Sequence, residues 1–153
     1  MFLKENKPYK IIWYSILLIL TISFVGYNKI MEIQQHDTYL VINVVQVGLI
    51  LAFILSLIAF IYWIIRHRKN NYYLTKIHIL LTITCASLIM VFGLFSNYFK
   101  GVNFPLYCKI ILVLIFLFLL VQLLLILNIG YSLSRKKKWM FKIKKLSAIK
   151  LFK

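Results

Sequence analysis

Acidic residues and proline are scarce in this chain of 153 residues. Three Asp and Glu residues stand against 19 Lys and Arg, and the only prolines are Pro8 and Pro105. Long runs carry no charge, and both prolines lie outside the centres of those runs. Ion-coupled transporters usually place ionisable groups and broken helices inside the membrane. The sequence therefore disfavours transport, and an oligomeric pore stays open as an alternative.

Cysteine is also scarce, with two residues in the chain. Cys85 lies near the middle of one apolar run and Cys108 near the start of the next, so their depths in a membrane should differ by about 10 Å. A disulfide needs Cα atoms about 4.4–6.8 Å apart. The chain has no CxxC pair and no Cys/His metal pattern. We expect both cysteines to pack as small apolar side chains.

Hydrophobic residues, by contrast, are abundant. They make up 63% of the chain, against about 45–50% in soluble domains, and the mean hydropathy is +0.90. A soluble core of this size cannot hide so much apolar surface. This composition excludes a soluble enzyme, a disordered chain and a disulfide-stapled secreted domain.

Four stretches contain no Asp, Glu, Lys or Arg: residues 11–28, 38–65, 77–99 and 110–134. A spanning helix needs about 20 mostly apolar residues, and continuous apolar runs favour helices over the alternating strands of a barrel. We predict an all-α integral membrane protein with four transmembrane helices and short loops. The transmembrane domain covers residues 1–134, with spans at about 11–28, 40–65, 74–98 and 106–130, and a basic tail covers 135–153.

The distribution of positive charge predicts the orientation. With four spans, the N-terminus, the middle loop and the C-terminus share one side of the membrane, and that side holds 16 of the 19 Lys and Arg residues. Because Lys and Arg concentrate on the cytoplasmic side, both termini should be cytoplasmic. We expect the protein in the cell's inner membrane.

Polar residues in the spans suggest a second layer of organisation. His36, Tyr39, Asn43 and Gln46 follow one another at spacings of three, four and three, which would place them on one face of the second helix. Gln122 offers a polar group on the fourth span. We interpret these residues as hydrogen-bonding partners between helices, with a ligand or cofactor site as the alternative. His78, near the inner end of the third span, is expected to reach water or a headgroup.

The C-terminal tail is strongly basic and carries no acid. Each Lys or Arg beside an anionic leaflet contributes about 1 kcal/mol to membrane binding. We therefore expect the tail to contact anionic lipids of the inner leaflet, with a protein partner as an alternative and nucleic acid disfavoured. The residues expected to make this contact are Arg135, Lys136, Lys137, Lys138, Lys142, Lys144 and Lys145.

One short stretch is more specific. HDTYLVI, residues 36–42, resembles subunit I of haem–copper oxidases, in which an HDTY motif begins a helix on the outer side of the membrane. The resemblance implies that His36 and Asp37 match a pair near a non-redox metal site. Val44 and Gln46 stand where that family has its two haem-ligating histidines. Valine cannot bind iron and glutamine is not a normal haem ligand, so we expect no haem. The alternative interpretation, which we favour over a metal site at His36 and Asp37, is that Asp37 or Thr38 caps the second helix.

These observations favour a non-enzymatic membrane protein that acts by helix packing, or as an accessory subunit beside other membrane subunits. Two other functions stay open. One is a redox subunit holding haem or a metal at His36 and Asp37, and the other is a small pore or a lipid-interacting protein.

Overall fold

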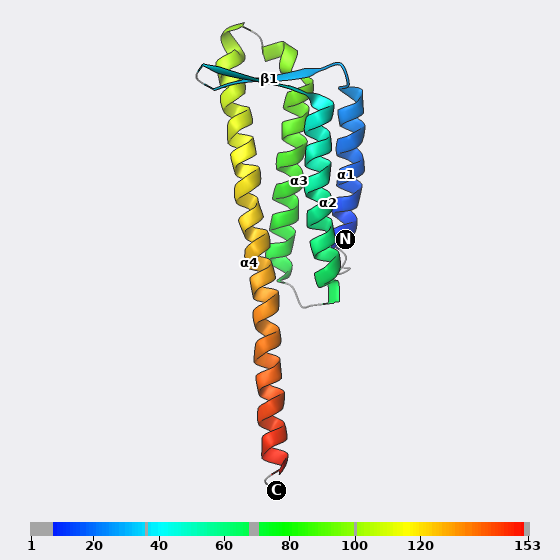
Figure 1. Ribbon diagram of the computed structural model, residues 1–153, viewed down its shortest axis with the longest axis vertical. Helices are drawn as coiled ribbons and strands as arrows, with labels where there is room; N and C mark the ends of the chain where they lie inside the picture. The colour runs from blue at the N-terminus through cyan, green and yellow to red at the C-terminus, as the bar shows by residue number, and fades with distance from the viewer. Residues whose placement is uncertain (1–7, 36, 68–70, 100, 152–153) are drawn as a thin grey trace.

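The computed structural model describes residues 8–35, 37–67, 71–99 and 101–151. Four long helices form its body: α1 (Pro8–Val25), α2 (Val44–Ile64), α3 (Tyr72–Leu94) and α4 (Phe104–Leu151). All four have a segment long and apolar enough to cross a membrane, which in α4 is Phe104–Tyr131. The prediction of a largely helical protein with four helices able to span a membrane is confirmed. The helices lie side by side, and α4 continues well past the bundle (Figure 1).

Small residues allow α1 and α2 to pack closely. A Cβ atom placed on Gly48 would lie 2.5 Å from the Ser23 Cβ, so this crossing requires glycine. The Ser23 hydroxyl donates to the carbonyl oxygens of Val44 and Val45, at 3.4 and 3.3 Å. Small residues and interhelical hydrogen bonds are the usual means of helix association in lipid, because lipid itself is as apolar as the side chains.

A β-hairpin, absent from the prediction, connects α1 to α2. Its strands are β1 (Ile30–Gln35) and β2 (Thr38–Asn43), paired antiparallel from Ile30 opposite Asn43 to Gln35 opposite Thr38. The prediction of a second helical span from about residue 40 is therefore wrong at its start. Lack of charge does not distinguish a strand from a helix, and the β-branched and aromatic residues of TYLVI favour a strand.

Asn43 ends the hairpin and begins α2. Its side-chain oxygen accepts from the Val45 N–H at 2.9 Å, and the Gln46 side chain accepts from the Asn43 N–H at 3.3 Å. This reciprocal pair is a capping box, which satisfies backbone donors that the first turn of a helix leaves unpaired. The helix consequently starts at Val44, and Asp37 lies in the turn between the strands. The prediction that Asp37 or Thr38 caps this helix is wrong.

The hairpin lies across one end of the bundle (Figure 1). It follows α1 and precedes α2 in the chain, and it contacts the segment after α3 and the start of α4. Met31 and Ile33 on β1 are buried. The Ser96 hydroxyl donates to the Ile30 carbonyl at 2.7 Å, and the Gln34 N–H donates to the Cys108 sulfur at 3.3 Å. Strand β1 is thus bonded to Ser96, just after the end of α3, and to the first turns of α4, more than sixty residues away in the sequence.

Short 3-10 turns complete the connections. η1 (Ile65–His67) follows α2, while η2 (Ser96–Phe99) and η3 (Gly101–Asn103) lie between α3 and α4. Gly101 has a φ of 77°, a conformation that glycine adopts without a steric penalty. Asn71 caps α3 by accepting from the Tyr73 N–H at 3.1 Å. Both cysteines are buried, in agreement with the expected packing, and Cys108 in addition accepts the hydrogen bond from Gln34.

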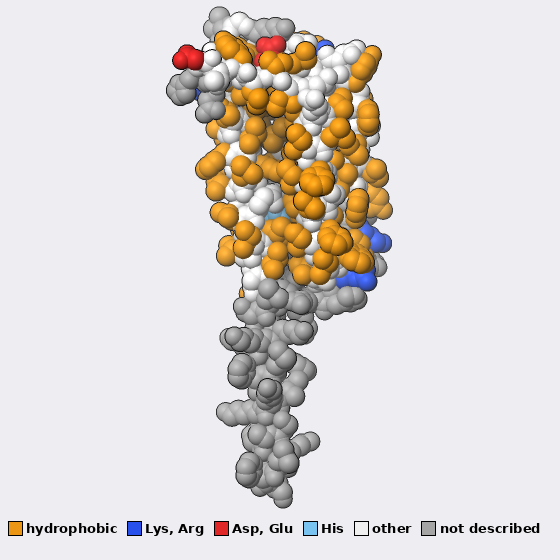
Figure 2. Space-filling model, in the orientation of Figure 1, with side chains coloured by type: hydrophobic (Ala, Val, Ile, Leu, Met, Phe, Trp, Pro, Cys, Tyr) orange, Lys and Arg blue, Asp and Glu red, His pale blue; other side chains and the backbone are white. Residues whose placement is uncertain are grey.

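The outer surface of the bundle is as apolar as its interior. Figure 2 shows hydrophobic side chains over the visible face, with acidic side chains at the hairpin end. Large apolar residues are exposed on each of the four long helices, for example Leu17, Phe53, Leu80 and Phe116. Such a continuous apolar surface is unusual for a soluble monomer and fits contact with lipid.

Candidate functional site

Six polar side chains meet between α2, α3 and α4, at the end of the bundle opposite the hairpin. Five of them are buried, and Gln122 is partly buried. The set consists of Tyr62 from α2, Thr75, His78 and Thr82 from α3, and Gln122 and Asn128 from α4. A polar group buried in lipid or protein is costly unless it is hydrogen-bonded, so their clustering requires mutual bonds.

His78 is the centre of this polar cluster. Its Nδ1 lies 3.1 Å from the Tyr62 hydroxyl, and its Nε2 lies 3.3 Å from Gln122 Oε1. The Tyr62 and His78 rings are in tilted contact, with centroids 5.8 Å apart. Three helices are therefore joined through one imidazole, which is fully buried.

The partners of His78 define its tautomer. Gln122 Oε1 can only accept, and the Thr82 hydroxyl donates its proton to the His78 carbonyl at 2.7 Å. The Thr82 oxygen lies 3.4 Å from Nε2, and Gln122 Oε1 lies 3.3 Å from it. Because both of these oxygens can only accept a proton from Nε2, Nε2 must carry one. In a neutral imidazole Nδ1 is then the acceptor, and the Tyr62 hydroxyl donates to it. Every donor in this part of the cluster has an acceptor without any charge on His78.

Asn128 closes the cluster toward the α2–α3 connection. Its amide nitrogen donates to the Thr75 hydroxyl at 2.7 Å and to the Tyr62 hydroxyl at 3.4 Å. The Thr75 hydroxyl in turn donates a hydrogen bond to the Asn71 carbonyl at 2.9 Å. Asn128 Oδ1 is buried without a partner among the described residues. One water molecule donating to this oxygen would complete the network.

The polar cluster corrects the prediction for His78. We expected this residue to reach water or a headgroup, whereas it is fully buried and bonded to other helices. The error arose because its depth was judged from position along the span alone. A usable signal was present: Thr75, His78 and Thr82 are spaced by three and four, which places them on one helical face.

The predicted polar stripe does not form. Tyr39 lies on β2, Asn43 is the N-cap of α2, and Gln46 completes the capping box, so these residues do not share a helical face. His36 lies outside the described residues. The interpretation of one stripe on the second helix is therefore wrong. Gln122 does bond to another helix, but its partner is His78.

The positions that the oxidase resemblance singles out have structural roles. Val44, at the place of one haem-ligating histidine, is fully buried in the core. Gln46, at the place of the other, caps α2. Asp37 is exposed in the hairpin turn. Across the described residues, no three His, Cys, Asp or Glu side chains gather as a metal site.

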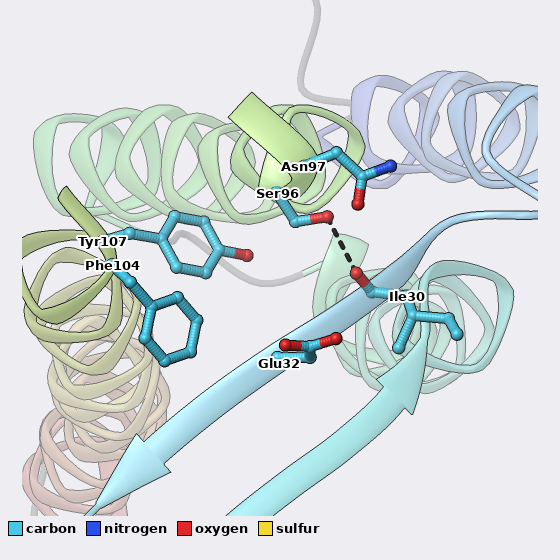
Figure 3. Close-up of a pocket in the computed structure, with 6 residues that line it drawn as sticks. All are labelled: Ile30, Glu32, Ser96, Asn97, Phe104 and Tyr107. Carbon is cyan, nitrogen blue, oxygen red and sulfur yellow. Dashed lines mark hydrogen bonds between the residues drawn. The ribbon is translucent and has the colours of Figure 1, made fainter. Parts of the chain in front are cut away.

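A small pocket lies at the hairpin end, between β1, η2 and the start of α4 (Figure 3). It is lined by Ile30, Glu32, Ser96, Asn97, Phe104 and Tyr107. The Tyr107 side chain is 1% exposed, and its hydroxyl has no hydrogen-bond partner within the described part of the chain. In Figure 3 this hydroxyl points into the space between Ser96 and Glu32.

The basic tail continues helix α4 beyond its apolar segment. The backbone of α4 is helical to Leu151. The side chains predicted to contact lipid, from Arg135 to Lys145, lie outside the described ones.

Comparisons with protein-family models, with curated proteins and with solved structures found no match to this chain. The class of protein therefore follows from the fold alone: a multi-pass membrane protein with four helices long and apolar enough to span the bilayer.

Proposed function

We propose that this protein is a non-enzymatic subunit of the cell's inner membrane that acts by packing against another membrane protein. The observation that carries the proposal is that strand β2 is uncovered by the described residues, both on its two faces and along the edge away from β1. Tyr39, Leu40 and Val41 are 65%, 54% and 60% exposed, so both faces of this strand are uncovered.

The two edges of the hairpin differ. Strand β1 is bonded to Ser96 and Cys108 at the ends of α3 and α4. Strand β2 pairs only with β1 in the two-stranded sheet that the described residues form. A strand edge that no other strand covers can offer backbone N–H and C=O groups to a further strand, which pairs with them in register. A lipid headgroup cannot do so, which is why a protein is the proposed partner.

The polar cluster supports a structural role for the bundle interior. His78 bonds to Tyr62 and to Gln122 and so connects three helices, and both hydrogen bonds can be assigned without a charge or an outside ligand. Such bonds hold helices in register. A redox subunit with haem or metal at His36 and Asp37 is the weaker alternative, because Val44 and Gln46 already have other roles.

The orientation completes the proposal. Both termini and the α2–α3 connection face the cytoplasm, where most Lys and Arg residues lie, and the hairpin faces the opposite side. The basic tail then lies against the anionic inner leaflet. The partner accordingly contacts this protein at the outer surface of the membrane.

A matched pair of substitutions tests the proposal. Tyr39→Lys places a charge on β2, whereas Tyr98→Lys places the same charge on an even more exposed tyrosine of η2, 77% exposed, at the same end of the bundle. After extraction in a mild detergent, a stoichiometric partner should co-purify with the wild type and with Tyr98→Lys, and should be lost with Tyr39→Lys. A partner retained by both variants, or no stoichiometric partner at all, would contradict the proposed function.

A further inference from the structure

We propose that the hairpin-end pocket binds a primary ammonium group, as carried by an ethanolamine lipid headgroup or by a soluble primary amine. The inference does not depend on the proposed function, because it rests on the residues that line the pocket and on its size.

The first observation is an unsatisfied hydroxyl. Tyr107 is almost fully buried, yet its hydroxyl has no partner among the described residues and points into the pocket (Figure 3). Buried polar groups in native proteins are nearly always hydrogen-bonded, so an orphan of this kind requires an occupant. The occupant must be small and polar and must lie between Ser96 and Glu32.

The second observation is the chemistry of the lining. Glu32 brings a carboxylate, and within the described part of the chain this carboxylate has no ion pair and no hydrogen bond. The Ser96 hydroxyl donates to the Ile30 carbonyl at 2.7 Å, so toward the pocket its oxygen can only accept a hydrogen bond. An ammonium group cannot accept the proton of the Tyr107 hydroxyl, so in the proposed site Glu32 takes that proton as a hydrogen-bond acceptor. The pocket then presents three acceptor groups to the ligand: Glu32, Ser96 and the Tyr107 oxygen. An ammonium group has three N–H donors and no acceptor.

The third observation is an aromatic wall. The Phe104 and Tyr107 rings stack with centroids 6.3 Å apart, and both line the pocket. Tyr107 also stacks against Phe99, with centroids 5.3 Å apart, so the ring that remains to meet a cation is Phe104. The quadrupole of an aromatic ring attracts a cation to its face. A carboxylate beside aromatic rings favours an organic cation over an anion or a neutral molecule.

Size then selects the kind of ammonium. The pocket volume is about 10 Å³, and a cavity of roughly 10–15 Å³ on this measure holds one water. A primary ammonium group is close to water in size, whereas a trimethylammonium group is several times larger. Glu32 and Asn97 are exposed, so the stem of the amine can leave toward the surface. Because α4 enters the apolar bundle just below Tyr107, a lipid headgroup can reach this opening.

The test uses purified full-length protein and a ligand series that changes only the amine. Thermal unfolding is followed while dihexanoyl-phosphatidylethanolamine, its N-methyl and N,N-dimethyl derivatives, and dihexanoyl-phosphatidylcholine are titrated. A ligand that binds the folded state raises the midpoint in proportion to its affinity. We expect affinity to fall with each methyl group, and phosphatidylcholine to bind at least about tenfold more weakly than phosphatidylethanolamine.

Two variants with matched controls assign the site. Glu32→Gln should weaken phosphatidylethanolamine binding at least about tenfold, because it removes a charge-assisted hydrogen bond, while Asp37→Asn should leave it unchanged. Tyr107→Phe should weaken it several-fold, and Tyr98→Phe should not. If a pocket variant does not fold, the methylation series on the wild type decides alone.

The remaining arms distinguish the sources and the rivals. Free ethanolamine that binds as tightly as the lipid supports the ammonium site with a soluble amine as its ligand. The proposal is overturned if phosphatidylcholine equals phosphatidylethanolamine, or if K⁺ competes with the amine at equal affinity. It is also overturned if no amine raises the midpoint, which would mean that the pocket holds a water only.

Discussion

Tyr62→Phe is the sharpest perturbation of the polar cluster, because it removes one oxygen and keeps the buried ring. That oxygen donates to His78 Nδ1 at 3.1 Å and accepts from Asn128 at 3.4 Å. A hydrogen bond between membrane helices contributes about 0.6 kcal/mol on average and up to about 1.7. Leaving a buried acceptor unpaired costs about 1–3 kcal/mol. We expect Tyr62→Phe to lower the free energy of unfolding by about 1–3 kcal/mol.

A double-mutant cycle isolates the bond between Tyr62 and His78. His78→Leu removes the same interaction from the other side. It also removes the bond to Gln122, but that loss is common to the single and the double variant and cancels in the cycle. The coupling energy should therefore be about 0.6–1.7 kcal/mol. Tyr73→Phe is the matched control, because this tyrosine is 74% exposed near the same end of the bundle. It should change stability by less than about 0.5 kcal/mol.

Reversible unfolding in bicelles measures these values. Additivity of Tyr62→Phe and His78→Leu within about 0.5 kcal/mol would refute the reasoning. An effect of Tyr62→Phe no larger than that of Tyr73→Phe would refute it as well.

Four further predictions follow from the fold, the orientation and the resemblance. Asn43→Ala should destabilise the protein by about 0.5–2 kcal/mol through loss of the α2 cap, whereas Asp37→Ala should be almost silent in the same unfolding assay. If Asp37 instead binds a metal, Asp37→Asn should be destabilising and a chelator should lower the melting temperature of the wild type. A reporter fused after Lys153 should be active only in the cytoplasm, and activity only outside it would overturn the charge argument. Because Val44 and Gln46 stand where the oxidase family has its haem-ligating histidines, the purified protein should have no Soret band. A stoichiometric haem spectrum that is lost in His78→Ala would show the expectation of no haem to be wrong. Replacing Lys136, Lys137, Lys138, Lys144 and Lys145 by Gln should weaken binding of the isolated tail to anionic vesicles, and salt should mimic the loss; equal binding to neutral and anionic vesicles would reject the electrostatic account.

The number of helices could be predicted from the sequence because charge is so costly in a bilayer. The first three runs and the start of the fourth are bounded by charged residues, and a helix lies within or across each run. These residues are Lys10, Lys29, Asp37, Arg66, Lys76, Lys100 and Lys109. The hairpin could not be predicted in this way. Residues 38–43 are as free of charge as the helix that follows, and their pairing partner at 30–35 lies on the other side of a turn.

The polar cluster was partly within reach of the sequence. Gln122 was recognised as a group that bonds between helices, and the spacing of Thr75, His78 and Thr82 was available. Tyr62 and Asn128 were not, since each is a lone polar residue near the end of its span. Only the packing of α2 and α4 against α3 brings them within 3.4 Å of each other. The Tyr107 pocket was likewise out of reach, because it forms where the unpredicted hairpin meets η2 and α4.

Photo-cross-linking in intact membranes tests the central claim, that strand β2 contacts another membrane protein, most directly. A photoreactive residue replaces Val41 on the exposed edge or, as the control, Phe116 on the lipid-facing surface of α4, and both positions are about 60% exposed. We predict one discrete protein adduct from position 41 and only lipid adducts from position 116. The absence of a protein adduct at position 41, or the same adducts at both positions, would contradict the claim.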